Sequence, residues 1–175
     1  MTQPPPLPWK SALEHQFVAA LDMVENAIDA CPEPVWDDPA TPVPQRFWYL
    51  AYHTLFWLDL YLSESEQGFA PPAPYTLGEL DPAGVYPPHA YVKSELLAYL
   101  AHGRDKLRRV FVTLGEACAV ERCEFGSRKM SVFELHLYNM RHVQHHAAQL
   151  NLILRQRTDS APRWVSRGVI AADEP

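Results

Sequence analysis

The positions of the prolines constrain the fold of this chain more than any other feature of its sequence. All but two of the 17 prolines fall within residues 4–8, 32–44 and 71–88. Proline has no backbone N–H and its ring clashes with the preceding helical turn, so it is excluded from helix interiors. Helices are therefore predicted within the three long proline-free stretches, which are residues 9–31, 45–70 and 89–161.

The last of these stretches is too long for one globular helix. Gly115, Gly126 and the polar residues 121–129 predict a break, and no strand-like alternation competes with the helical periodicity. Two S-x-x-E capping boxes, Ser11 with Glu14 and Ser131 with Glu134, predict where the first and last helices begin. Four helices are expected, at about residues 11–30, 45–63, 90–114 and 131–155.

Length and composition fit a compact helical protein. The 175 residues, of which 47% are apolar, suffice for one domain with a real core. We predict an all-α single domain, residues 1–175, with a four-helix bundle over about 11–155 and an irregular C-terminal tail over 156–175. One long crossover, residues 64–89, carries six prolines and is either functional or a plain connection. The tail either docks or frays.

Charge argues against nucleic acid as a partner. The net charge is −6, whereas phosphate binding needs concentrated Lys and Arg. The nearest approach to a basic patch is formed by Arg104, Lys106, Arg108 and Arg109, and Asp105 interrupts it. We interpret this segment as a solvated helix face.

Cysteine use and hydropathy predict a cytoplasmic protein without a membrane span. The three cysteines are odd in number and none has CxxC spacing, so a disulfide framework is not expected. The N-terminus lacks a basic region followed by an apolar run, so no signal peptide is expected. The longest apolar stretch, residues 47–58, is too short to cross a bilayer.

The fourth predicted helix carries polar residues where its buried stripe should be apolar. At helical spacing its core-facing positions are Leu135, Asn139, His142, His146, Gln149 and Ile153. Burying a polar group without a partner costs about 1–3 kcal/mol, so some compensating interaction is expected. His142 and His146 are one turn apart, so both rings lie on one face and can converge on one metal ion.

His53 can provide a third ligand. It lies in the middle of the second predicted helix, among apolar and aromatic neighbours. The residues alone leave two alternatives open, a metal site and a hydrogen-bonded core network. His145 points away from His146 and suits a surface or supporting role. The remaining histidines lack a convergent partner in the sequence and are expected to be structural or exposed: His15, His89, His102 and His136.

Two motifs carry a family resemblance. Tyr52-His53-Thr54 in the aromatic second helix and the residues HVQHHAAQL, 142–150, in the fourth resemble the DinB-like (YfiT-like) family of metalloenzymes. The resemblance implies a four-helix bundle with one long crossover, a homodimer, and zinc or nickel on His53, His142 and His146, with water in the open positions. Where many relatives have Arg-Gly this chain has Ala147-Ala148, which bears on whether it shares an anionic substrate or thiol cofactor.

An open three-histidine site suits a metal-dependent enzyme acting on a small molecule. The family resemblance favours transfer or isomerisation with a low-molecular-weight thiol. Metal-assisted hydrolysis is the second choice, because Val143 stands where His-Glu-x-x-His motifs carry their general base. A non-catalytic, stress-related metal-binding or interaction protein is the third. Four further residues could orient or line the site, or simply pack: Tyr49, Trp57, Asn139 and Gln149.

Overall fold

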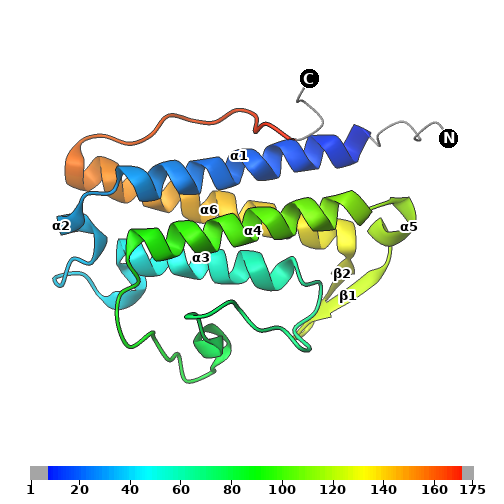
Figure 1. Ribbon diagram of the computed structural model, residues 1–175, viewed down its shortest axis with the longest axis horizontal. Helices are drawn as coiled ribbons and strands as arrows, with labels where there is room; N and C mark the ends of the chain where they lie inside the picture. Colours follow the sequence, from blue (N-terminus) through cyan, green and yellow to red (C-terminus); the bar gives the residue numbers. More distant parts are fainter. Residues whose placement is uncertain (1–7, 171–175) are drawn as a thin grey trace.

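Four long helices make up about half of the chain (Figure 1). The computed structural model describes residues 8–170, and residues 1–7 and 171–175 lie outside the described part. The N-terminal residues on which the expectation of no signal peptide rests are therefore not described. The long helices are α1 (Pro8–Ala30), α3 (Phe47–Tyr61), α4 (Lys93–Thr113) and α6 (Val132–Thr158). The predicted all-α four-helix class is confirmed.

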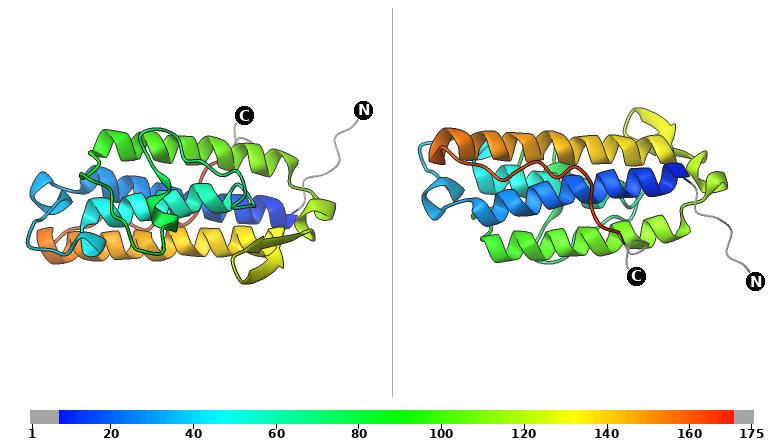
Figure 2. Two further views of the ribbon diagram at one scale, coloured as in Figure 1. Left: turned by 90° about the horizontal axis from the view of Figure 1, so that it is seen from below. Right: turned by 90° about the horizontal axis from the view of Figure 1, so that it is seen from above.

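The helices form a closed ring in the order α1, α6, α3, α4 (Figure 2). Each of α1 and α3 packs against both α6 and α4. Because α3 and α4 run in the same direction, the chain must return along the bundle between them, and the crossover, residues 62–92, does so across the outer face of α3 (Figures 1 and 2). The predicted long crossover is therefore present.

The core follows the predicted stripes in α1 but is rotated in α6. The apolar stripe of α1 is buried throughout, from Leu13 to Ile28. In α6 the fully buried residues include Asn139, Val143 and Ala147, whereas His142 and His146 are only partly buried. The expectation that both histidines lie in the core stripe is wrong. Since α6 packs between α1 and α3, its core face shifts by one residue and leaves the histidines at the edge facing α3.

The two predicted capping boxes have different outcomes. The Oγ atom of Ser131 accepts a hydrogen bond from the backbone N–H of Glu134 at 3.2 Å, as predicted. In contrast, α1 is already helical at Pro8, so Ser11 lies inside the helix and the predicted start is wrong. Proline is tolerated in a first turn. The extension also packs the ring of Trp9 against Phe133 with centroids 5.0 Å apart.

Short elements connect the long helices. The proline-rich segments hold α2 (Glu33–Trp36), the 3-10 turns η1 (Val43–Gln45) and η2 (Leu77–Leu80), while α5 (Glu116–Ala119) follows α4. The predicted break near residues 121–129 contains an unexpected antiparallel hairpin of β1 (Arg122–Phe125) and β2 (Arg128–Ser131). Gly126 has φ +56°, which a tight hairpin turn requires and glycine adopts without strain.

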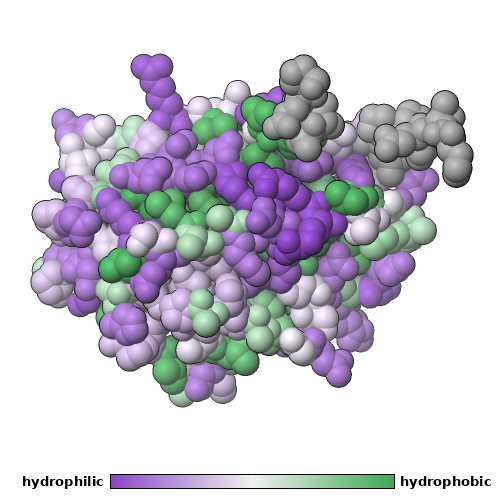
Figure 3. Space-filling model, in the orientation of Figure 1, coloured by the Kyte–Doolittle hydropathy of each residue, from purple (hydrophilic) through white to green (hydrophobic). Residues whose placement is uncertain are grey.

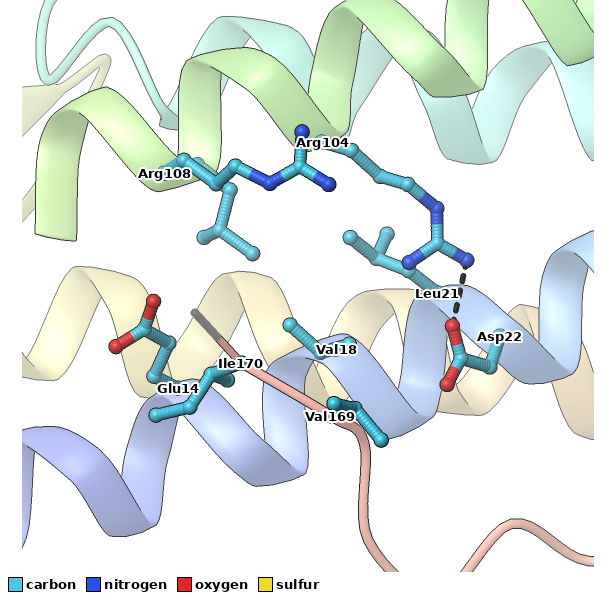
Figure 4. A pocket seen from close by; sticks show the side chains of 9 residues that line it. Glu14, Val18, Leu21, Asp22, Arg104, Arg108, Val169 and Ile170 are labelled. Atoms are coloured by element: carbon cyan, nitrogen blue, oxygen red, sulfur yellow. Dashed lines mark hydrogen bonds and ion pairs between the residues drawn. The ribbon is translucent and has the colours of Figure 1, made fainter. Parts of the chain in front are cut away.

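The described part of the C-terminal tail docks along α1 (Figure 1). The backbone N–H of Gly168 donates to the carbonyl of His15 at 3.1 Å, and His15 Nδ1 lies 3.0 Å from the carbonyl of Gly168. A Cβ atom at position 168 would come within 2.5 Å of Val18, so glycine permits this close approach. Val169 and Ile170 then lie beside Val18 in a hollow between α1 and α4 (Figure 4).

The surface in the view of Figure 3 is mixed, with apolar side chains scattered among polar ones. Within residues 8–170, none of the helices combines the length and apolar character needed to cross a membrane.

Candidate metal centre

The structure brings the three predicted histidines together between α3 and α6. One ring nitrogen from each of His53, His142 and His146 lies within 4.8 Å of the others. The ring centroids are 5.4 Å apart for His53 and His142, 4.9 Å for His53 and His146, and 4.5 Å for His142 and His146. All three residues are partly buried.

A carboxylate from the crossover fixes the ring of His53. The Nδ1 atom of His53 lies 2.6 Å from Oε2 of Glu79, a residue of η2. Tyr49 donates its hydroxyl to Oε1 of the same carboxylate at 2.6 Å, and Trp57 donates its indole N–H to Oε2 at 3.1 Å. A carboxylate that accepts from Nδ1–H leaves Nε2 of the imidazole free to bind a cation.

Glu79 is held in its charged form although its side chain is only 4% exposed. Burial acts to raise the pKa of Glu79, but the hydrogen bonds from His53, Tyr49 and Trp57 outweigh it, and the pKa is lowered. In this charged form the carboxylate is the acceptor for the donors around it.

The other two rings differ in their support. The Nδ1 atom of His146 lies 2.7 Å from Oε1 of Gln149 one turn later, where the amide oxygen accepts its N–H. The Nδ1 atom of His142 is buried and has no hydrogen-bond partner among the described residues. A cation held on this nitrogen would satisfy the otherwise unpartnered imidazole. The donor set therefore fits a divalent metal.

The electrostatics of the group favour neutral imidazoles. Burial, together with His146 and His53, lowers the pKa of His142 to about 3. Burial and the neighbouring His53 lower the pKa of His146 to about 4. Neutral imidazole is the form that binds metals, so at neutral pH these two rings are ready to ligate without losing a proton.

The four further candidates fall into two groups. Tyr49 and Trp57 flank His53, with ring centroids 6.4 and 6.2 Å away, and Gln149 holds His146. Asn139 instead lies in the buried packing of α6 against α3, where its amide N–H donates to the carbonyl of Leu58 at 3.1 Å. Sequence reasoning missed Glu79, because nothing in the pattern of a proline-rich crossover indicates which residue reaches α3.

The remaining histidines are structural or exposed, as predicted. His145 is exposed, with its ring 5.1 Å from that of His146. The others serve separate contacts: His15 with the tail, exposed His89 beside Tyr91, His102 with Asp59 at 3.4 Å, and fully buried His136 with Glu64 at 3.3 Å.

Two other features of the surface help to define the site. The hollow in Figure 4 is lined by charged groups that are already paired, since Arg104 contacts Asp22 at 2.7 Å and Arg108 contacts Asp105 at 2.7 Å. In contrast, a cavity of about 210 Å³ opens directly beside His142. His142 is the member of the histidine group that lines this cavity.

The fold and site together define a helical-bundle protein with a three-histidine group between two antiparallel helices. A family model of the DinB superfamily matches residues 16–150. The chain belongs to the DinB superfamily, and the resemblance seen in its two histidine motifs is confirmed. Neither the curated proteins nor the solved structures give a significant match.

Proposed function

We propose that this protein binds a divalent metal ion on His53, His142 and His146 and uses it as an open catalytic centre. The observation that carries the proposal is the convergence of three ring nitrogens within 4.8 Å of one another. Three protein ligands with an open position are typical of catalytic zinc, whereas structural zinc sites are closed by four. Imidazole ligands suit zinc and nickel, the two metals we expect.

The reaction that the surroundings support best is transfer or isomerisation with a thiol. When bound, the cation supplies Lewis acidity, which favours the deprotonated form of a thiol or of water. Glu79 and Gln149 orient His53 and His146, and the side chains of Tyr49 and Trp57 cover the His53 side of the group. A small-molecule substrate would approach from the cavity beside His142.

The same surroundings argue against hydrolysis. A hydrolase needs a general base beside its attacking water. Glu79, the carboxylate that contacts the histidine group, already accepts three hydrogen bonds and has a lowered pKa, so it is a poor base. Val143, which stands where His-Glu-x-x-His motifs have glutamate, is buried. A thiolate nucleophile needs no such base.

Metal content tests the binding proposal directly. Protein purified without a histidine tag should hold about one equivalent of zinc or nickel per chain, because each chain has one group of three histidine ligands. His53→Ala and His146→Ala should lose the metal, whereas His145→Ala, which removes an exposed neighbour, should keep it. Wild-type protein that stays metal-free after loading with zinc, nickel and manganese would show the proposal to be wrong.

The reaction needs its own assay. Metal-loaded protein is incubated with an electrophile and glutathione, bacillithiol or mycothiol, and adduct formation is followed before and after chelation. A rate that depends on both the metal and one of the thiols is expected. If no thiol supports a metal-dependent rate while an ester substrate is hydrolysed, the hydrolase alternative replaces the transferase. A loaded but inactive protein would favour the non-catalytic alternative.

A further inference from the structure

A second cavity, of about 260 Å³, lies between the crossover and α4. Its walls are formed by residues 72–75 of the crossover and by Glu95, Ala98, Tyr99 and His102 of α4. None of these residues belongs to the histidine group, so the cavity is a separate feature of the molecule. An apolar cavity of about 150 Å³ is enough to hold benzene, so this one has room for a single substituted ring.

The walls of this cavity are mostly apolar and aromatic. Pro72 and Pro74 contribute their aliphatic rings. The rings of Tyr75 and Tyr99 stack on each other, with centroids 4.1 Å apart and planes 13° apart. Both tyrosines are buried, whereas Ala98 is exposed, so the cavity opens to solvent along α4. Walls of this kind suit a flat apolar ring.

The polar groups of the walls offer acceptors rather than donors to a ligand. Tyr75 donates its hydroxyl to the backbone carbonyl of Glu95 at 2.6 Å. Tyr99 donates its hydroxyl to the carboxylate of Asp59 at 3.2 Å. The carboxylate of Glu95 can only accept, and its Oε2 atom already accepts the backbone N–H of Val92 at 2.8 Å. A ligand that makes a hydrogen bond in this cavity is therefore expected to be the donor.

His102 provides the acceptor whose orientation is best defined. Its Nε2 atom lies 3.4 Å from Oδ1 of Asp59, a carboxylate that also pairs with Lys106 at 2.5 Å. Because a carboxylate can only accept, Nε2 carries the hydrogen, and Nδ1 of the neutral imidazole is left as an acceptor. Asp59 is only 1% exposed and is itself held by Lys106, so it fixes the tautomer of the ring.

We infer that this cavity binds a small phenol, with its ring against the proline and tyrosine walls and its hydroxyl donating to Nδ1 of His102. The size of the cavity sets one ring, the apolar walls set its character, and the acceptor sets the hydroxyl. An aromatic carboxylate is disfavoured, because the carboxylate of Glu95 lies in the same wall. The site goes beyond the proposed function, since it needs no metal and uses none of the three histidine ligands.

Binding is measured with p-cresol and with 4-fluorotoluene, in which fluorine replaces the hydroxyl and cannot donate. Each ligand is titrated into the protein, and the backbone amide NMR signals around Ala98 should shift and saturate. His102→Phe keeps a ring but removes the acceptor. The ratio of the p-cresol affinity to the 4-fluorotoluene affinity should therefore fall about fivefold in this variant, the size of one neutral hydrogen bond. The ratio cancels the different hydrophobicity of the two ligands.

Ala98→Leu fills the cavity and should abolish binding of both ligands. Its matched control is Ala101→Leu, at an exposed position of α4 outside the cavity wall, which should bind both ligands as wild type does. The same spectra show whether each variant is folded. Wild-type protein without saturable shifts, binding that survives in Ala98→Leu, or an affinity ratio that His102→Phe leaves unchanged would overturn the inference. These results do not depend on a metal, so they leave the proposed function standing.

Discussion

His53 lies in a helix whose other residues are mostly buried and apolar, so its polar ring needs a compensating interaction there. Glu79 provides part of it, by accepting the Nδ1–H of His53 and the donors of the two aromatic residues one turn either side. The three donors explain why Tyr49 and Trp57 accompany the histidine. In this arrangement the two aromatic residues hold a carboxylate.

Glu79→Gln should weaken metal binding while leaving the fold intact. The amide keeps the shape of the side chain but loses the charge that fixes the His53 tautomer and raises its basicity. Loss of such a supporting carboxylate typically lowers metal affinity about 10- to 100-fold. Competition with a chromogenic chelator measures the change. The matched control is Glu66→Gln, an exposed glutamate of the same crossover, which should bind metal as wild type does.

The lowered pKa values of His142 and His146 predict acid sensitivity of the metal-free protein. An unfolded histidine has a pKa near 6.5, so below this pH the unfolded chain binds protons that the folded state excludes. Stability is therefore lost as the pH falls from about 6.5 toward the folded values of about 3 and 4. For His142, the loss between pH 7 and pH 5 is about 1–2 kcal/mol.

Urea unfolding of the chelated protein at these two pH values measures the effect. His142→Gln should show a smaller loss than wild type, because glutamine binds no proton. His145→Gln, which alters an exposed ring, should lose as much stability as wild type. An identical loss in His142→Gln would mean that His142 can be protonated in the folded state.

The three histidines could be predicted from the sequence, but their supporting residues could not. His142 and His146 share a face by helical spacing alone, and His53 joined them through the family resemblance. Glu79 could not be found, since its contact depends on the path of a crossover without regular periodicity. Gln149 was a candidate on spacing, and so was Asn139, which turned out to serve helix packing.

At the scale of elements, the parallel pair α3 and α4 is joined by a buried charge. The carboxylate of Asp59 is 1% exposed and lies 2.5 Å from Lys106 Nζ. Tyr99 donates its hydroxyl to the same carboxylate at 3.2 Å, and Lys106 also donates to the Ser63 hydroxyl at 2.6 Å. The segment from Arg104 to Arg109, predicted to be a solvated face, thus contains a residue that ties two helices together.

Lys106→Met should destabilise the protein strongly, because it leaves Asp59 buried without its cation. Breaking a buried pair from one side costs about 3–5 kcal/mol. Adding Asp59→Asn to this variant removes the unpaired charge and should restore part of the stability. The control is Arg108→Met, which breaks an exposed pair with Asp105 and should cost less than about 1 kcal/mol. Chemical denaturation of the three variants and wild type measures these differences.

The start of α6 was predictable, because the capping residue Ser131 marks it. The start of α1 was not, because Pro8 is compatible with a first turn and Trp9 gains a packing partner in Phe133, far along the chain. The hairpin was missed because its two strands have four residues each and only one short ladder. Such strands are set by their packing under α6, which local sequence does not encode.

At the scale of the whole molecule, the histidine group links three segments that are far apart in the sequence. His53 comes from α3, His142 and His146 from α6, and Glu79 reaches His53 from η2 in the crossover. A metal on the three rings would therefore act on the crossover through Glu79 as well as on the two helices. Ligands that bind only the folded state stabilise it by about 2.7 kcal/mol at 100 times their Kd.

Metal binding is thus expected to order the crossover at a distance from the ion. Hydrogen exchange of the backbone amides in Leu77–Leu80 should slow on metal loading, together with exchange in the middle of α3 and α6. Glu79→Gln, loaded at a metal concentration high enough to fill the site, should keep the protection in the helices and lose it in the crossover. Protection confined to α3 and α6 in wild-type protein would show that the crossover takes no part in holding the metal, and that Glu79 acts on His53 alone.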